Sequence, residues 1–192
     1  MASDAGGPVT IAVDGWIIDV QHGLPLTYGY RRQRAVLCEE FELSLAEGDS
    51  CFLAVTKGDE PRSRLVLAQR YQPSGNGFEP GVAFVPETGV LFAGAGTRLL
   101  AYALSGQPER LGEDYARCGF WHWSVHGSAV LMAAELEFAA WTSAGEKLWT
   151  TFVEPPWTYQ VDGDQVQLDV MGRISEFPVS SGPAGGREVP SP

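Results

Sequence analysis

Apolar and polar residues alternate in short stretches along this chain, and turn residues separate the stretches. In Phe41-Glu42-Leu43-Ser44-Leu45 the apolar side chains recur at every second position, which predicts a β-strand with one buried face. Residues 31–40 are compatible with a short helix, and the pattern there does not decide the matter. The chain is therefore expected to consist mainly of short strands.

The segment 130–141 fits two periodicities. Its apolar residues form a helical stripe and its alanines favour a helix, but alternate residues also fall on one face of a strand. The counterpart of this segment, residues 166–177, contains Gly172 and is followed by Pro178, so it is poor helix material. We therefore predict strands in both segments.

Five glycines lie in short turns, each after one apolar run and before the next: Gly15, Gly48, Gly89, Gly127 and Gly163. Glycine adopts the positive φ angles that tight hairpins need, and a neighbouring aspartate strengthens the hairpin signal. The spacings between these glycines are 33, 41, 38 and 36 residues. Such recurrence indicates about five structural repeats.

The last two repeats align without a gap at an offset of 36 residues. In this alignment Trp121 corresponds to Trp157, and Trp123 corresponds to Tyr159. If equivalent positions lie at the same height in neighbouring sheets, Trp121 and Trp157 approach one rim of the array. Strand alternation also places Trp121 and Trp123 on one face of their strand and His122 on the other.

Residues 138–149 carry an aromatic-Ala-Ala run, then a glycine, and then a Leu-Trp pair. This pattern resembles a repeat of the WD-repeat/quinoprotein-type (PQQ-like) β-propeller superfamily, clearly over residues 79–182 and by turn spacing alone over residues 9–78. Trp141 stands where those repeats usually have aspartate, and Ala144 stands where they have threonine before the glycine. The resemblance therefore implies an array of β-meanders, and no cofactor is expected.

The predicted fold is all-β: a propeller-like array of about five antiparallel β-meander repeats, with a curved β-sandwich as the alternative. Five repeats in residues 9–179 leave about 34 residues each, which barely accommodates four short strands. One repeat-built domain is expected over residues 9–179. Residues 1–8 are expected to form a flexible N-terminus, and residues 180–192 a disordered C-terminal tail.

The formal net charge of −11 restricts the partners. Nucleic-acid-binding proteins normally carry a basic patch, whereas the basic cluster of this chain is Arg31, Arg32 and Arg34, which fits a solvated face. An acidic surface is also repelled by anionic membranes, and the residues after Met1 lack the basic and apolar regions of an export signal. We expect no nucleic-acid and no membrane partner.

The cysteines indicate the redox compartment. Cys38, Cys51 and Cys118 are odd in number and form no CxxC pair. This usage fits reduced thiols better than a disulfide framework, so a cytoplasmic location is expected.

Three groups of residues suggest chemistry at first sight. His122 and His126 are four residues apart, but on a strand their imidazoles would lie about 13 Å apart, too far to share a zinc ion. Residues 162–169 hold three aspartates without the glutamate and loop spacing of an EF-hand. Cys118 has no catalytic signature around it. No catalytic, cofactor or metal site is predicted.

Aromatic residues give the stronger functional signal. Five of the six tryptophans lie between residues 121 and 157, and most are expected in the core between sheets. Trp157 follows Glu154-Pro155-Pro156, which implies a connection at a rim and a partly exposed ring. The predicted partner-binding residues are Trp157, Trp121 and His122.

These observations favour a non-catalytic intracellular binding or scaffold module, with another protein or a small ligand as its partner. A small-ligand-binding regulatory protein and a hydrolase with a site assembled from distant residues are the alternatives. A flat aromatic patch would favour the module, and polar groups gathered at one mouth of the array would favour the regulatory protein. A buried His–Asp or Glu–Glu pair in a pocket would favour the hydrolase.

Overall fold

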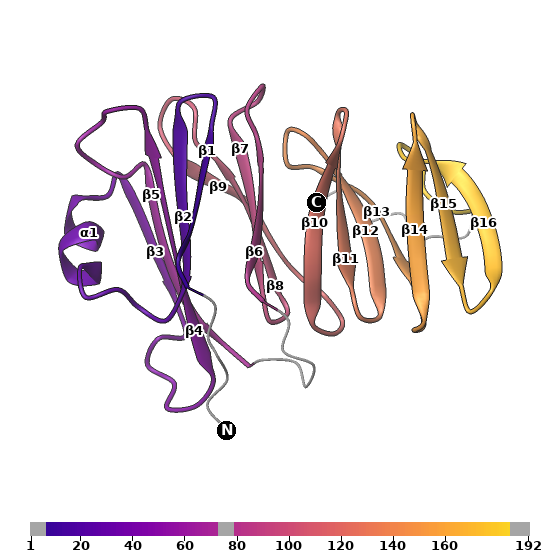
Figure 1. Cartoon of the computed structure of the whole chain (residues 1–192), viewed down its shortest axis with the longest axis horizontal. Coiled ribbons are helices and arrows are strands. Elements are labelled where there is room, and N and C mark those ends of the chain that lie inside the picture. Colours follow the sequence, from indigo (N-terminus) through magenta and orange to yellow (C-terminus); the bar gives the residue numbers. More distant parts are fainter. Residues whose placement is uncertain (1–6, 73–78, 185–192) are drawn as a thin grey trace.

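The computed structural model describes residues 7–72 and 79–184. These residues form sixteen β-strands in four sheets and one short helix, which confirms the predicted all-β class. The four sheets follow one another in chain order from one end of the molecule to the other (Figure 1). No helix in the described part of the chain has the length and apolar content needed to cross a bilayer.

The first sheet has the strand order β1-β2-β4-β5-β3, in which β3 and β5 are parallel. Its strands are β1 Val9–Val13, β2 Trp16–His22, β3 Leu37–Phe41, β4 Asp49–Lys57 and β5 Leu65–Tyr71. The helix α1, Tyr28–Arg34, connects β2 with β3. Tyr28 and Ala35 pack against the face of the sheet that carries Phe52 and Val66, at the outer end of the array (Figure 1).

The other three sheets are antiparallel meanders whose strands follow chain order. The second sheet consists of β6 Gly81–Val85, β7 Val90–Ala95, β8 Arg98–Ala103 and β9 Glu109–Tyr115. The third sheet consists of β10 Phe120–His126, β11 Ala129–Ala134, β12 Glu137–Thr142 and β13 Lys147–Phe152. The fourth sheet consists of β14 Trp157–Asp162, β15 Gln165–Val170 and β16 Arg173–Pro178.

The core lies in three layers, one between each pair of neighbouring sheets. Alternating side chains point to opposite faces of a strand, so one sheet can contribute to two layers. The large rings at the three interfaces are Trp16 and Tyr102, then Phe92, Trp123 and Trp141, and finally Phe138, Trp149 and Phe177. Each large apolar side chain that is fully buried stabilises the fold by about 1.5–3 kcal/mol.

The fourth sheet ends the array with a polar face. Thr158, Gln160, Gln165 and Gln167 are exposed, whereas the residues that alternate with them, such as Val166, pack toward the third sheet. A polar outer face on the terminal unit keeps a repeat array soluble. The first and fourth sheets lie at opposite ends, so the described residues form an open array rather than a ring (Figure 1).

Several expectations for individual segments can now be compared with the structure. Residues 130–141 are the strands β11 and β12, so the preference for strand over helix is confirmed. The strand predicted over residues 41–45 is wrong, because β3 ends at Phe41 and the chain then reverses. Glu42 has a φ of 57°, and the amide of Leu45 donates to the Glu42 carbonyl at 3.0 Å.

The number of repeats also differs from the prediction. Gly15 forms the turn between β1 and β2 as expected, but Gly48 precedes β4 in a loop that connects no hairpin. The first two predicted repeats are therefore parts of one five-stranded sheet. The described residues form four sheets instead of about five.

The packed chain continues beyond the boundary predicted at residue 180. The indole Nε1 of Trp149 donates to the Val179 carbonyl at 2.6 Å, and Gly182 is buried. Gly182 has a φ of +70°, and a Cβ atom at this position would lie 2.5 Å from the Trp149 ring. Residues 179–184 thus belong to the packed structure, whereas the rest of the predicted tail, residues 185–192, lies outside the described residues, as does most of the predicted flexible N-terminus.

Candidate functional site

A β-bulge at Trp121 shapes the first strand of the third sheet. The pairing register between β10 and β11 shifts between Phe120 and His122, so Trp121 is an extra residue in the strand. A bulge re-aims the side chains around it. As a result Trp121 and His122 both face the fourth sheet, whereas Trp123 packs in the layer toward the second sheet.

The bulge overturns two expectations about the tryptophans. Trp121 and Trp123 do not share a face, and Trp121 is not the structural equivalent of Trp157. Phe120 takes that equivalent position, because it pairs with the last residue of β11 just as Trp157 pairs with the last residue of β15. Trp121 and Trp157 instead face one another, with ring centroids 5.2 Å apart and planes inclined by 13°.

Trp157 forms part of the core rather than an exposed anchor. Only 6% of its surface is exposed, and its Nε1 donates to the Glu135 carbonyl at 3.2 Å. Its ring also packs on Phe138, with centroids 5.4 Å apart. The expected partly exposed ring at Trp157 is therefore wrong. Trp121 is the half-buried member of the stacked pair.

A chain of hydrogen-bonding groups runs beside the stacked indoles. The hydroxyl oxygen of Tyr159 lies 3.0 Å from Nε2 of His122 and 2.8 Å from Oγ of Ser124. Ser124 Oγ lies in turn 3.1 Å from Nε2 of His126. The imidazole of His122 also stacks on the Tyr159 ring, with centroids 6.0 Å apart. Hydroxyl and neutral imidazole groups both donate and accept hydrogen bonds. This row of side chains can therefore pair with either a donor or an acceptor on a ligand.

Partial burial shifts the pKa values of His122 and Tyr159 in the direction that favours their uncharged forms. It lowers the pKa of His122 below the ordinary value of 6.5, because an imidazolium is less well solvated there. Burial also raises the pKa of Tyr159, and the hydrogen bond with Ser124 offsets part of that rise. The imidazole of His122 is therefore neutral and the phenol of Tyr159 is protonated at pH 7.

These side chains line an open cleft of about 480 Å³ between β10 and β14. Both strands lie at an edge of their sheets. No Asp, Glu, Lys or Arg side chain is among the described residues that line the cleft, although the net charge of the chain is −11. The lining residues are Trp121, His122, Ser124, His126, Ala133, Trp157, Thr158, Tyr159, Gln160 and Val161.

The three residues predicted from the sequence, Trp157, Trp121 and His122, meet in this cleft. Their role in binding a partner stays a prediction. Sequence reasoning missed Ser124 on β10 and Tyr159 on β14, whose hydroxyl groups meet across the cleft. A signal for Ser124 was available, because polar residues at every second position follow His122 along the strand. Tyr159 could be interpreted only as a core residue.

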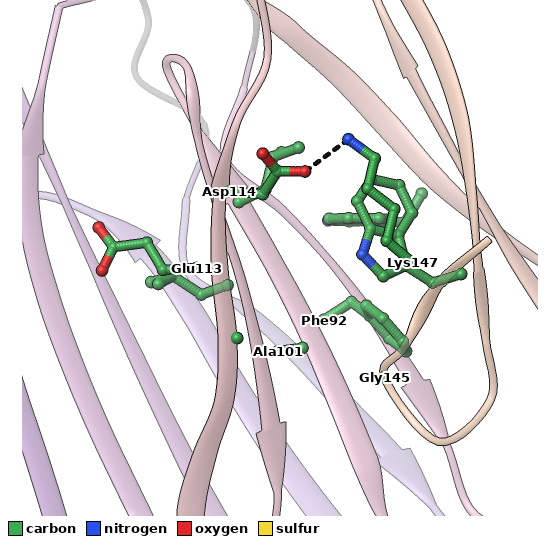
Figure 2. Close-up of a pocket in the computed structure, with 11 residues that line it drawn as sticks. Phe92, Ala101, Glu113, Asp114, Gly145 and Lys147 are labelled. Atoms are coloured by element: carbon green, nitrogen blue, oxygen red, sulfur yellow. Dashed lines mark hydrogen bonds and ion pairs between the residues drawn. The ribbon is translucent and has the colours of Figure 1, made fainter. Parts of the chain in front are cut away.

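A second hollow, of about 290 Å³, lies between the second and third sheets (Figure 2). Lys147 and Asp114 point toward one another there, whereas Glu113 points away from the pair. The Lys147 ammonium donates to Oδ2 of Asp114 at 2.6 Å and lies 3.5 Å from Oε1 of Glu137. These charged groups satisfy each other and connect β9 with β13. We therefore regard the uncharged cleft as the better candidate for a binding site.

The Cys118 thiol is engaged in a hydrogen bond. The Cys118 thiol donates to Oε2 of Glu135 at 3.0 Å, and this hydrogen bond raises the pKa of Cys118. Its nucleophilic thiolate form is therefore disfavoured at neutral pH. Among the described residues, no group of three or more His, Cys, Asp or Glu side chains is arranged to hold a metal ion.

No family model matches the sequence, and no curated protein matches it either. Similar solved structures include the computationally designed Ika8 protein, with 10% identity and a TM-score of 0.48 over 91% of this chain. The chain spans about half, 46%, of the length of Ika8. The computationally designed Ika4 protein has 14% identity and a TM-score of 0.43, covering 55% of this chain and 69% of its own.

At these TM-scores and identities neither likeness bears on the function of the chain. The WD-repeat/quinoprotein-type resemblance has no support from a family model. It stays a prediction.

Proposed function

We propose that this protein is a non-catalytic binding module and that the cleft between β10 and β14 is its binding site. The observation that carries the proposal is the combination of stacked rings and a hydrogen-bonded chain in a cleft without charged side chains. Sites for small ligands are typically concave, largely aromatic or apolar, and furnished with a few placed polar groups. The volume of about 480 Å³ favours a small ligand or a short segment of a larger one.

The cleft also suits binding because its walls are held in place. Trp157 and Phe138 fix the wall that carries Tyr159, and the Tyr159 hydroxyl connects that wall to Ser124 on the other. A preformed site avoids the conformational entropy cost of ordering loops when the ligand arrives. The pattern in residues 138–149 further supports our inference that the meanders are distant relatives of WD-repeat/quinoprotein-type repeats.

Ligand-observed NMR with a set of neutral, cationic and anionic ring fragments tests this proposal. We expect neutral fragments to give most of the saturation-transfer signals, because the cleft offers no countercharge. Trp121→Ala should abolish these signals, and Ser124→Ala should weaken them. Val125→Ala is the matched control, since Val125 is 43% exposed on the same strand and does not line the cleft. Hits that persist in Trp121→Ala would place binding elsewhere and overturn the proposal.

A further inference from the structure

We propose that the ligand of this cleft is a neutral saccharide that stacks the apolar face of a sugar ring on the aromatic wall. This inference rests on the proposed function and specifies the chemistry of its ligand. Three properties of the cleft carry it: the aromatic surface, the type of hydrogen-bonding groups, and the missing charge among its described lining residues.

The aromatic surface suits a sugar ring. Trp121 is half-buried and is backed by Trp157, while the exposed His122 ring lies over Tyr159. The two stacks lie side by side, and each joins one ring from β10 with one ring from β14. One face of a pyranose presents C–H hydrogens with partial positive charge, and these complement the negative π-face of an aromatic ring. Flat rings that cannot rotate freely lose little entropy when such a ligand binds.

The hydrogen-bonding groups match sugar hydroxyls. A sugar hydroxyl both donates and accepts, and so do the side chains of Ser124 and Tyr159, which meet in the cleft. Because His122 is neutral at pH 7, its imidazole also offers one donor and one acceptor. Each of these groups can therefore act as donor or as acceptor toward a neighbouring sugar hydroxyl.

The charge of the molecule excludes acidic glycans. The cleft offers no cation among its described lining residues, and the net charge of −11 repels uronates and sulfated sugars. A peptide that adds as a strand to the edge of β10 is a less suitable occupant, because such pairing needs a regular sheet edge. The free edge of β10 is interrupted by the bulge at Trp121, and bulges block such pairing.

A glycan array probed with the full chain, followed by calorimetric titration of the best neutral oligosaccharide, tests this inference. We expect neutral gluco-, manno- or chito-oligosaccharides to bind with a Kd of about 1 mM or below, and acidic glycans to bind at least about tenfold more weakly. Trp121→Ala should weaken binding by about tenfold or more, and Ser124→Ala by about fivefold. Val125→Ala should bind like the unmodified chain.

The outcomes separate this inference from the proposed function. If neutral fragments or an uncharged tetrapeptide bind in the cleft while no neutral glycan binds, the inference of a saccharide ligand is wrong. The proposal that the cleft is a binding site is then supported. If no probe of any class binds, both are wrong. If Trp121→Ala fails to fold, Trp121→Phe and Ser124→Ala replace it. Saccharide affinity that is unchanged in both of these variants would overturn the inference.

Discussion

Trp121 and Trp157 stack on one another, yet they contribute differently to the molecule. Trp157 is 6% exposed and donates a hydrogen bond to the Glu135 carbonyl, so its removal leaves a large cavity and a buried acceptor. Trp157→Ala should lower the free energy of unfolding by about 3–5 kcal/mol in a urea titration. Trp121→Ala should cost less, about 1–2 kcal/mol, because that ring is only partly buried in the folded protein. Equal losses in the two variants would contradict the assignment of Trp157 to the core.

His122 makes stability depend on pH. Burial lowers its pKa in the folded protein below 6.5, so the unfolded chain binds the proton more tightly. Stability is therefore fully present above pH 6.5 and falls as the pH drops through the folded pKa. We expect the fall in melting temperature between pH 7.5 and about pH 5 to be smaller in His122→Gln than in the unmodified protein. Parallel pH profiles for the two proteins would show that burial does not shift this imidazole.

At the scale of elements, the ion pair between β9 and β13 connects the outer strands of two sheets. Lys147 lies between Asp114, whose side chain is 38% exposed, and Glu137, whose side chain is 6% exposed. Lys147→Met leaves Glu137 buried without its cation and should cost about 3 kcal/mol in chemical unfolding. Asp114→Asn is the matched control and should cost less than about 1 kcal/mol, because an exposed pair contributes little.

Adding Glu137→Gln to Lys147→Met should recover part of the lost stability, since it removes the uncompensated charge. If Asp114→Asn costs as much as Lys147→Met, the buried carboxylate is not the source of the effect.

The pattern of apolar residues predicted some of these strands but not their irregularities. The strands β11 and β12 were predicted because the counterpart segment is unsuited to a helix. Periodicity alone did not decide, because both faces of these strands are buried and the apolar run is nearly continuous. The bulge at Trp121 was not predicted, because the apolar alternation from Trp121 to Val125 places Trp121 and Trp123 on one face of a regular strand. Trp121 was therefore placed on the wrong face of its strand.

At the scale of the whole molecule, regular glycine spacing gave the meander architecture but not the number of sheets. Gly48 has the spacing of a hairpin turn, yet the chain there runs from the parallel strand β3 to β4. Pairing between β3 and β5 depends on contacts between segments far apart in sequence, which a local pattern does not record. The outer face of the fourth sheet is mostly polar, as expected of a face that no neighbouring sheet covers among the described residues.

The central claim is that ligand binds between the third and fourth sheets and not in the charged hollow between the second and third. Four of the six tryptophans report on both places, because Trp121 and Trp157 line the cleft while Trp123 and Trp141 line the hollow. The indole N–H signals of ¹⁵N-labelled protein, recorded while a neutral oligosaccharide is added, test the claim most directly. We predict shifts at Trp121 and Trp157 with Trp123 and Trp141 unchanged. Shifts confined to Trp123 and Trp141 would contradict the account.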